Sequence, residues 1–281
     1  SKTMNQTRVD NGHATEAAVF RALGARGVCL IDNERRQRCT YALDNLTDHA
    51  LRDRIIKQSA WLVDRLLTKE QPSRAAMTGE DGRFADIVLD DRLTLSVKHN
   101  SKEIGGQRLS RNSVHRLPLP GTPATSDVFK SEIEPAFIAL DTWQPGVKAE
   151  PWQRAFLHNT IGMAIVEELN RNPPVFRDVI PPHDHYLLTC GTKGPRIEGF
   201  NFHGSLNCSK VKLPLGRPSI RHQFRETRAQ GVRCLYWILI DYDGGWSIRL
   251  RLHTKGKIGP SCFGGSTTIE GTPGGFYRLE P

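Results

Sequence analysis

An acidic and a basic residue stand twelve positions apart, on either side of a short turn. Asp86 opens one apolar segment and Lys98 closes the next, and the acidic sequence 90–92 lies between the two segments. If that turn folds the chain back, the two side chains meet at one end of a hairpin. Such a pair suits metal-assisted hydrolysis of a phosphodiester: the carboxylate and the Val97 carbonyl hold Mg²⁺, and the lysine orients water.

The same spacing also fits a solvent-exposed hairpin in which Asp86 and Lys98 do no chemistry. Polar residues near Lys98 favour the catalytic interpretation, because His99 and Asn100 follow it directly. A basic block comes next, suited to phosphate contacts or to guanine edges. Its candidate DNA-binding residues are Lys102, Arg108, Arg111 and Arg116. Glu16, in an early predicted helix, either turns toward the same metal or lies on a solvated helix face.

The charge of the whole chain points to an anionic partner. The 281 residues carry a net charge of +9, with 27 arginines against 12 lysines. Residues 92–116 hold six lysines and arginines and one acid, and residues 193–257 hold thirteen against four. Guanidinium groups suit phosphate, and a basic excess held in blocks is typical of proteins that bind polyanions.

The pattern of apolar residues predicts the elements that must position these side chains. Helices are expected over 12–25, from Thr47 to residue 66, over 129–141 and over 151–170, with Pro151 in a first turn. Strands are expected over 84–89, 93–98, 186–189, 196–202, 234–241 and 246–253. Residues 70–83 are expected to be a polar connector. The change of texture predicts a division into an α/β part, 1–182, and a β-rich part, 183–281, which can share one core.

Composition excludes several classes of protein. With 38% hydrophobic and 25% charged residues, the chain is neither collagen-like, coiled-coil nor wholly disordered. Its longest apolar run, 236–240, is far too short to cross a membrane. We expect a cytoplasmic protein with free thiols, because the six cysteines form no zinc-like cluster. His183 and His185 suggest metal binding, but their place beside two prolines favours an exposed loop.

Several blocks together resemble a known family. The sequence 95–100, with Ala85-Asp-Ile-Val-Leu89 before it and Arg108-Leu-Ser-Arg111 after it, resembles the core of the HaeIII family of type II restriction endonucleases. Further blocks that resemble this family are 11–18, 200–207, 212–214 and 243–253. The blocks follow one another in the family's order, although 117–180 shows no match. The resemblance implies an α/β fold with a PD-(D/E)xK core, a mixed sheet flanked by helices, and a β-rich C-terminal half.

The resemblance also implies roles for individual residues. Asp86 becomes the metal-binding acid, Lys98 the catalytic lysine and Glu16 the supporting carboxylate and third metal ligand, while Asn100 acts at the scissile phosphate. One departure from the wider fold is Ser96, which stands where an Asp or Glu is normal. Glu16 is the candidate that compensates for it. Weaker candidates are Asp90 and Asp91. In the block 200–207, the groove-binding candidates are Asn201 and His203, whose alternative role is a self-bonded turn.

The implied activity is that of a type II site-specific deoxyribonuclease: Mg²⁺-dependent hydrolysis of double-stranded DNA, with a central blunt cut at GGCC and 5′-phosphate ends. A palindromic target implies a homodimer, and a restriction–modification system implies a cognate DNA methyltransferase. Three alternatives stay open. They are a repair or structure-specific nuclease of the same fold, a DNA-binding module without catalysis, and an RNA-binding protein.

Overall fold

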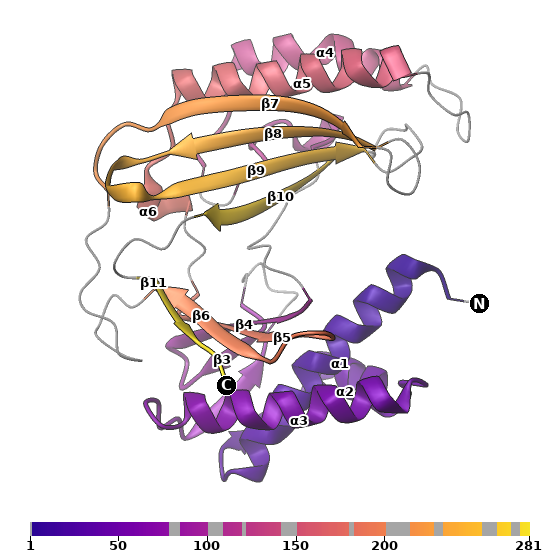
Figure 1. Cartoon of the computed structure of the whole chain (residues 1–281), viewed down its shortest axis with the longest axis vertical. Coiled ribbons are helices and arrows are strands. Elements are labelled where there is room, and N and C mark those ends of the chain that lie inside the picture. The colour runs from indigo at the N-terminus through magenta and orange to yellow at the C-terminus, as the bar shows by residue number, and fades with distance from the viewer. Residues whose placement is uncertain are drawn as a thin grey trace. The chain divides into compact units, whose positions relative to one another are not determined.

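The computed structural model describes residues 2–78, 85–100, 109–119, 122–141, 151–179, 183–200, 214–227, 233–254, 263–270 and 276–281 (Figure 1). The chain divides into two units that are interleaved in sequence. The first unit is Ser1–Lys102, Pro182–Lys212 and Gly274–Pro281, and the second is Glu103–Pro181 and Leu213–Pro273. The expected division at residue 182 does not describe this arrangement. The change from helices to strands there marks a return of the chain to the first sheet.

The first unit is a mixed seven-stranded sheet with three helices. The helices are α1 (Met4–Ala25), α2 (Glu34–Asp44) and α3 (His49–Leu66). The strands are β1 (Cys29–Leu30), β2 (Arg74–Met77), β3 (Ile87–Leu89), β4 (Leu93–His99), β5 (His185–Thr189), β6 (Arg196–Phe200) and β11 (Phe276–Leu279). Their order is β1-β2-β3-β4-β5-β6-β11. β1 is parallel to β2 and β4 to β5, and the other neighbours are antiparallel.

The helices of the first unit begin at side-chain caps. The Thr3 side chain accepts a hydrogen bond from the backbone N–H of Gln6, so α1 starts eight residues before the predicted residue 12. Asp48, rather than the predicted Thr47, caps α3 through the N–H of Leu51. The predicted connector 70–83 contains β2, whose pairing with β3 the local sequence did not indicate.

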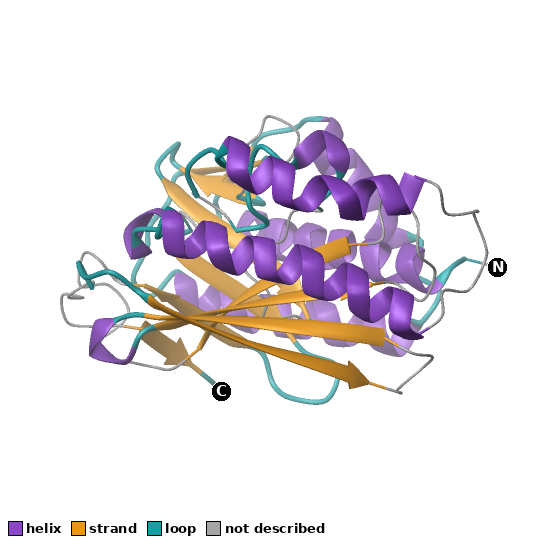
Figure 2. Cartoon of the chain, turned by 90° about the horizontal axis from the view of Figure 1, so that it is seen from above, coloured by secondary structure: helices purple, strands orange, loops and turns teal. Residues whose placement is uncertain are grey.

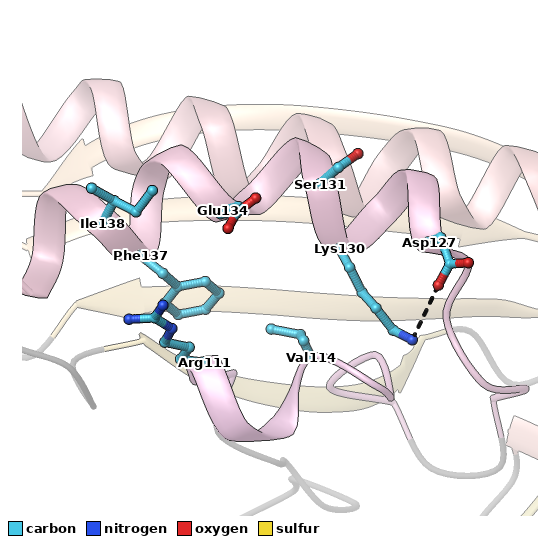
Figure 3. Close-up of a pocket in the computed structure, with 8 residues that line it drawn as sticks. All are labelled: Arg111, Val114, Asp127, Lys130, Ser131, Glu134, Phe137 and Ile138. Carbon is cyan, nitrogen blue, oxygen red and sulfur yellow. Dashed lines mark ion pairs between the residues drawn. The ribbon is translucent and has the colours of Figure 1, made fainter.

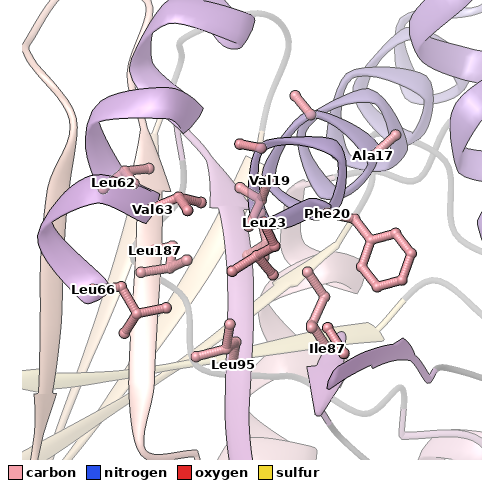
Figure 4. Close-up of a cluster of buried hydrophobic side chains, with 14 of the residues drawn as sticks. Ala17, Val19, Phe20, Leu23, Leu62, Val63, Leu66, Ile87, Leu95 and Leu187 are labelled. Atoms are coloured by element: carbon pink, nitrogen blue, oxygen red, sulfur yellow. The ribbon is translucent and has the colours of Figure 1, made fainter. Parts of the chain in front are cut away.

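Helices α1 and α3 bury their apolar faces against one side of this sheet (Figure 4). The helices contribute Ala17, Val19, Phe20, Leu23, Leu62, Val63 and Leu66, and the strands contribute Ile87, Leu95 and Leu187. Each large apolar side chain buried here stabilises the fold by about 1.5–3 kcal/mol. Leu95 and Val97 face this core, so the alternate residues of β4 face the opposite side.

The turn between β3 and β4 has the conformation that a tight hairpin requires. Asp90 and Asp91 both have positive φ, 51° and 57°, and the N–H of Arg92 bonds to the carbonyl of Leu89. The carboxylate of Asp90 accepts hydrogen bonds from the backbone of Ser73 and Arg74, at 2.9 and 3.0 Å. These two acids therefore serve the turn, at the other end of the strands from Asp86.

The second unit is an antiparallel sheet with two long helices beside it (Figure 2). The strands, in the order β10-β9-β8-β7, are β7 (Ser219–Thr227), β8 (Arg233–Asp241), β9 (Ser247–Thr254) and β10 (Phe263–Glu270). The helices are η1 (Arg111–Ser113), α4 (Asp127–Asp141), α5 (Pro151–Arg171), α6 (Phe176–Val179) and η2 (Asp243–Gly245). α5 packs on β7 and β8, and α4 packs on α5. As predicted, 243–245 turns the chain between two strands, with positive φ at Gly244 and Gly245.

The observed architecture is mixed α/β, as the sequence predicted at that level. Within the described ranges, no helix has both the length and the apolar character needed to cross a membrane.

Candidate functional site

The β3–β4 hairpin brings Asp86 and Lys98 to the same end of the sheet. Ile87 pairs with Leu95, so Asp86 comes level with Ser96 at the end of β3. Ser96 and Lys98 alternate with the core-facing Leu95 and Val97 along β4, and they therefore share the face away from the core. The hairpin predicted from the sequence is confirmed, and its register puts Asp86 level with Ser96, two residues before Lys98 on β4.

Hydrogen bonds fix the carboxylate of Asp86 to the neighbouring strand. Its Oδ2 accepts from the backbone N–H of Val97 at 2.7 Å and from the hydroxyl of Ser96 at 3.4 Å. Because the N–H and C=O of one strand residue point to the same side, the carbonyl of Val97 also lies on the side of Asp86. The two expected oxygen ligands, the Asp86 carboxylate and the Val97 carbonyl, therefore lie together at one end of the hairpin.

Glu16 belongs to α1, and its buried side chain lies close enough to Asp86 to interact with it electrostatically. Its two oxygens accept hydrogen bonds from Nη2 of Arg35, at 3.2 and 3.0 Å, and Oε2 lies 3.5 Å from the Cys39 thiol. Burial, followed by the nearby Asp86 carboxylate, raises the pKa of Glu16 from 4.5 to about 7 against the opposing effect of Arg35. The helix face that carries Glu16 is therefore not solvated, and the two acids repel each other across the site.

Lys98 is half-buried, and among the described residues it has no hydrogen bond or ion pair. It influences His183 electrostatically and contributes to lowering the pKa of that ring. Because no described residue pairs with it, the ammonium group of Lys98 is available for a ligand as far as the described part of the chain shows.

Asn100 and His99 end β4 in a hydrogen-bonded network. Asn100 has a positive φ of 56°, and its Oδ1 accepts from the N–H of Gly191 at 2.7 Å. Its Nδ2 lies 3.2 Å from His99 Nε2, and His99 Nδ1 lies 2.7 Å from the hydroxyl of Thr189. Both ends of the Asn100 amide are thus engaged in holding β4 against β5. Asn100 therefore fixes the end of β4, two residues after Lys98, to the end of β5.

The site also contains residues that sequence reasoning did not select or placed wrongly. Arg35 lies in a polar helix and carries no motif, so only its contact with Glu16 identifies it. His183 and His185 were expected in an exposed loop, and this prediction is wrong, because both are buried. His185 contacts Tyr277, and its Nε2 lies 3.4 Å from Oε1 of Glu70. The ring of His183 lies beside that of Tyr186 and interacts electrostatically with Asp86.

Two of the predicted DNA-binding residues are described, and both belong to the second unit. Arg111 extends along α4, where its Nη1 lies 2.6 Å from Asp141, and it lines a groove with Phe137 and Ile138 (Figure 3). Arg116 is exposed and forms an isolated antiparallel bridge with Ala124. The other four candidates, Lys102, Arg108, Asn201 and His203, lie outside the described residues.

The acids of the site can hold a metal ion only in a limited way. In the described ranges, no three His, Cys, Asp or Glu side chains are grouped as a metal centre. Mg²⁺ does not require such a group, because it keeps several waters and binds through one or two carboxylates. Asp86 and the Val97 carbonyl fit that requirement, and Glu16 is the second carboxylate nearby, held by Arg35.

Comparison of the chain with family models, curated proteins and solved structures finds no match in any of the three.

Proposed function

We propose that this chain is a Mg²⁺-dependent endonuclease of the type II restriction class, with a PD-(D/E)xK core, acting on double-stranded DNA. The observation that carries the proposal is the repulsion between Asp86, at the end of the β3–β4 hairpin, and Glu16 of α1, with Lys98 on the same hairpin. Among the described residues Lys98 has no hydrogen bond or ion pair. Two acids held close together favour a divalent cation, and a nearby ammonium favours an anionic substrate. The resemblance to the HaeIII family supports the same activity and GGCC as the target.

In this proposal each residue of the site has a separate task. Asp86, the Val97 carbonyl and Glu16 hold Mg²⁺, which when bound neutralises charge on the phosphate and acidifies water. Lys98 orients the attacking water and stabilises the charge that develops on the phosphate. The water oxygen bonds to phosphorus, the 3′-oxygen leaves, and the products carry a 5′-phosphate and a 3′-hydroxyl.

Further parts of the proposal follow from the target. A palindromic site favours a homodimer with two symmetry-related active sites, and a methyltransferase of the same specificity protects the host DNA. The DNA contacts are assigned to Lys102, Arg108, Arg111, Arg116, Asn201 and His203. An arginine among them that reads a guanine contributes about 1–3 kcal/mol of discrimination.

The experiment separates binding from cleavage. Asp86→Ala and Lys98→Ala are each compared with wild type for cleavage of plasmid in Mg²⁺ and for binding of a GGCC duplex in Ca²⁺. We expect cleavage to fall by several orders of magnitude in both variants while binding persists. Arg92→Ala, which removes an exposed cation from the same hairpin, is the matched control and keeps wild-type cleavage. Wild-type rates in the Asp86 or Lys98 variant contradict the assignment.

One observation favours a second candidate, a DNA-binding module without catalysis. Arg35 already neutralises Glu16, and Ser96 stands where the wider fold has an acid. In that case wild type binds duplex DNA and never nicks it in Mg²⁺, and Lys98→Ala binds as wild type does. Nicking by wild type excludes this candidate.

A further inference from the structure

Two buried polar side chains near Asp86 and Lys98, those of His183 and Tyr186, have polar atoms with no hydrogen-bond partner among the described residues. His183 is 4% exposed and Tyr186 is 6% exposed. In the described part of the chain, neither His183 Nδ1 nor the Tyr186 hydroxyl has a partner. A buried polar atom without a partner costs free energy, and a fold that keeps two of them together calls for an explanation.

The sheet register puts these groups in line with the candidate catalytic residues. Ser96 pairs with Tyr186 across β4 and β5, and Asp86 lies level with Ser96 on the other side. The three residues thus form one row across three strands, on the face away from the apolar core. Lys98 occupies the next position of that face along β4.

The backbone holds His183 beside this row. The next residue, Asp184, accepts two hydrogen bonds at Oδ2 from Thr94, from its backbone N–H at 2.9 Å and its hydroxyl at 3.1 Å. The N–H of Asp184 donates back to the carbonyl of Thr94 at 3.1 Å. The ring of His183 meets that of Tyr186 edge to face, with centroids 5.5 Å apart. These contacts fix the position of His183 next to Tyr186.

Both groups are uncharged at neutral pH. Burial, to which Lys98 adds, lowers the pKa of His183 from 6.5 to about 4 although Asp86 opposes the change. Burial and then Asp86 raise the pKa of Tyr186 well above 10. A neutral imidazole with its proton on Nδ1 and a phenol are hydrogen-bond donors. An oxygen anion is the ligand that two such donors beside an ammonium bind best.

We propose that Lys98, His183 and Tyr186 form an oxyanion subsite, which receives a non-bridging oxygen of the scissile phosphate. The inference rests on the proposed nuclease function and deepens it, because it names the substrate atom that these side chains contact. Among the described residues the two donors have no partner, and the phosphate oxygen supplies one. The hydrogen bonds strengthen as negative charge develops on that oxygen, so they contribute to kcat.

The first test uses the hydroxyl group alone. Tyr186→Phe is compared with wild type on a GGCC duplex and on both diastereomers of a phosphorothioate at the cut position. Sulfur is a weak hydrogen-bond acceptor, so we expect wild type to cut one diastereomer much more slowly. Tyr186→Phe is expected to lower kcat about 10- to 100-fold, the value of a hydrogen bond to a charged group. It is also expected to lose most of the difference between diastereomers.

The control is Tyr242→Phe, which removes another buried hydroxyl. Tyr242 lies in the second unit and donates to the carbonyl of Pro174 at 2.9 Å. Its loss is expected to lower Tm and to leave kcat and the diastereomer preference unchanged. Tyr186→Phe is expected to leave Tm unchanged or to raise it, because the lost hydroxyl had no partner. A Tyr186→Phe enzyme with wild-type kcat and an unchanged diastereomer preference overturns the subsite.

The imidazole is tested by a pair of substitutions at residue 183. His183→Asn keeps an N–H close to the position of Nδ1, whereas His183→Leu does not. We expect the asparagine variant to retain most of the wild-type kcat and the leucine variant to lose at least tenfold. Equal activity of the two variants contradicts a role for the N–H.

A binding measurement distinguishes failure of the subsite from failure of the nuclease proposal. Inorganic phosphate is titrated into wild type and into Tyr186→Phe, with no DNA and no metal ion present. If wild type does not cut DNA, the nuclease proposal fails, and the subsite stands only when the substitution weakens phosphate binding severalfold. Equal phosphate binding by the two proteins overturns the subsite whatever the outcome with DNA.

Discussion

Replacing Glu16 by glutamine should change how the stability of the metal-free protein depends on pH. The side chain is buried beside Asp86, and its pKa is raised from 4.5 to about 7. A folded-state pKa above the unfolded value means that the folded protein binds more protons between these values. Stability is therefore complete below pH 4.5 and falls as the pH rises to 7. Glutamine has no proton to lose, so the variant lacks this fall.

The size of the effect follows from the same difference. Multiplying the interval between 4.5 and about 7 by 1.36 kcal/mol per pH unit gives about 3 kcal/mol. Urea unfolding of wild type and Glu16→Gln in EDTA, from pH 4.5 to 8, measures it. The two stability curves should converge or cross toward acid pH and separate by about 3 kcal/mol over the range.

A third protein tests the cause. Asp86→Asn removes the second-largest contribution to the raised pKa of Glu16, so its stability should fall less with pH than that of wild type. Curves for wild type and Glu16→Gln that stay parallel from pH 4.5 to 8 contradict a raised pKa of Glu16, because they mean that Glu16 titrates alike in the folded and unfolded protein.

Three other substitutions test separate parts of the structure. Ser96→Asp puts a third acid beside Asp86 at a buried position. Tm in EDTA should therefore fall, by the equivalent of about 3 kcal/mol, and should recover in Mg²⁺. A Tm that does not respond to Mg²⁺ counts against a metal at this end of the hairpin. Asp90→Ala removes two hydrogen bonds of the hairpin turn and should cost about 1–2 kcal/mol in urea unfolding while cleavage stays at the wild-type rate. Lost cleavage with unchanged stability would make Asp90 a ligand after all. Leu23→Ala opens a cavity under α1, and urea unfolding should show a loss of about 2–5 kcal/mol; a loss below 1 kcal/mol means that α1 does not pack as described.

Elements with strong periodic patterns were predictable from the sequence. The apolar spacing in α3, α5 and β9 reflects one face buried and one face polar, and β8 is a short apolar run. The turns at 90–92 and 243–245 carry residues that tolerate positive φ. The β3–β4 hairpin, which carries Asp86 and Lys98 at the same end, followed from these local features alone.

Other elements gave no local signal. α2 is polar along most of its length, and only Cys39 and Leu43 are buried, so its helical state depends on packing against α1. β2 consists of Arg-Ala-Ala-Met, which acquires strand structure by pairing with β3. The interleaving of the two units follows from the return of β5 to the side of β4, a contact between residues about 90 positions apart.

The lack of a local sequence signal also explains why two residues of the site, Arg35 and Tyr186, were not predicted. Arg35 and Tyr186 carry no motif, and they reach Asp86 and Glu16 only through the packing of α2 on α1 and the pairing of β5 with β4. Helical or strand periodicity cannot report such contacts, because it describes each segment by itself.

We propose that Asp86, Glu16 and Lys98 together hydrolyse the backbone of duplex DNA. Digestion of unmethylated phage DNA by the wild-type protein in Mg²⁺, followed by sequencing of the ends, is the test of this activity. We expect discrete fragments with 5′-phosphate ends, cut centrally within GGCC, and intact DNA when EDTA replaces Mg²⁺. Phage DNA that stays intact in Mg²⁺, while the same protein preparation is folded, contradicts it.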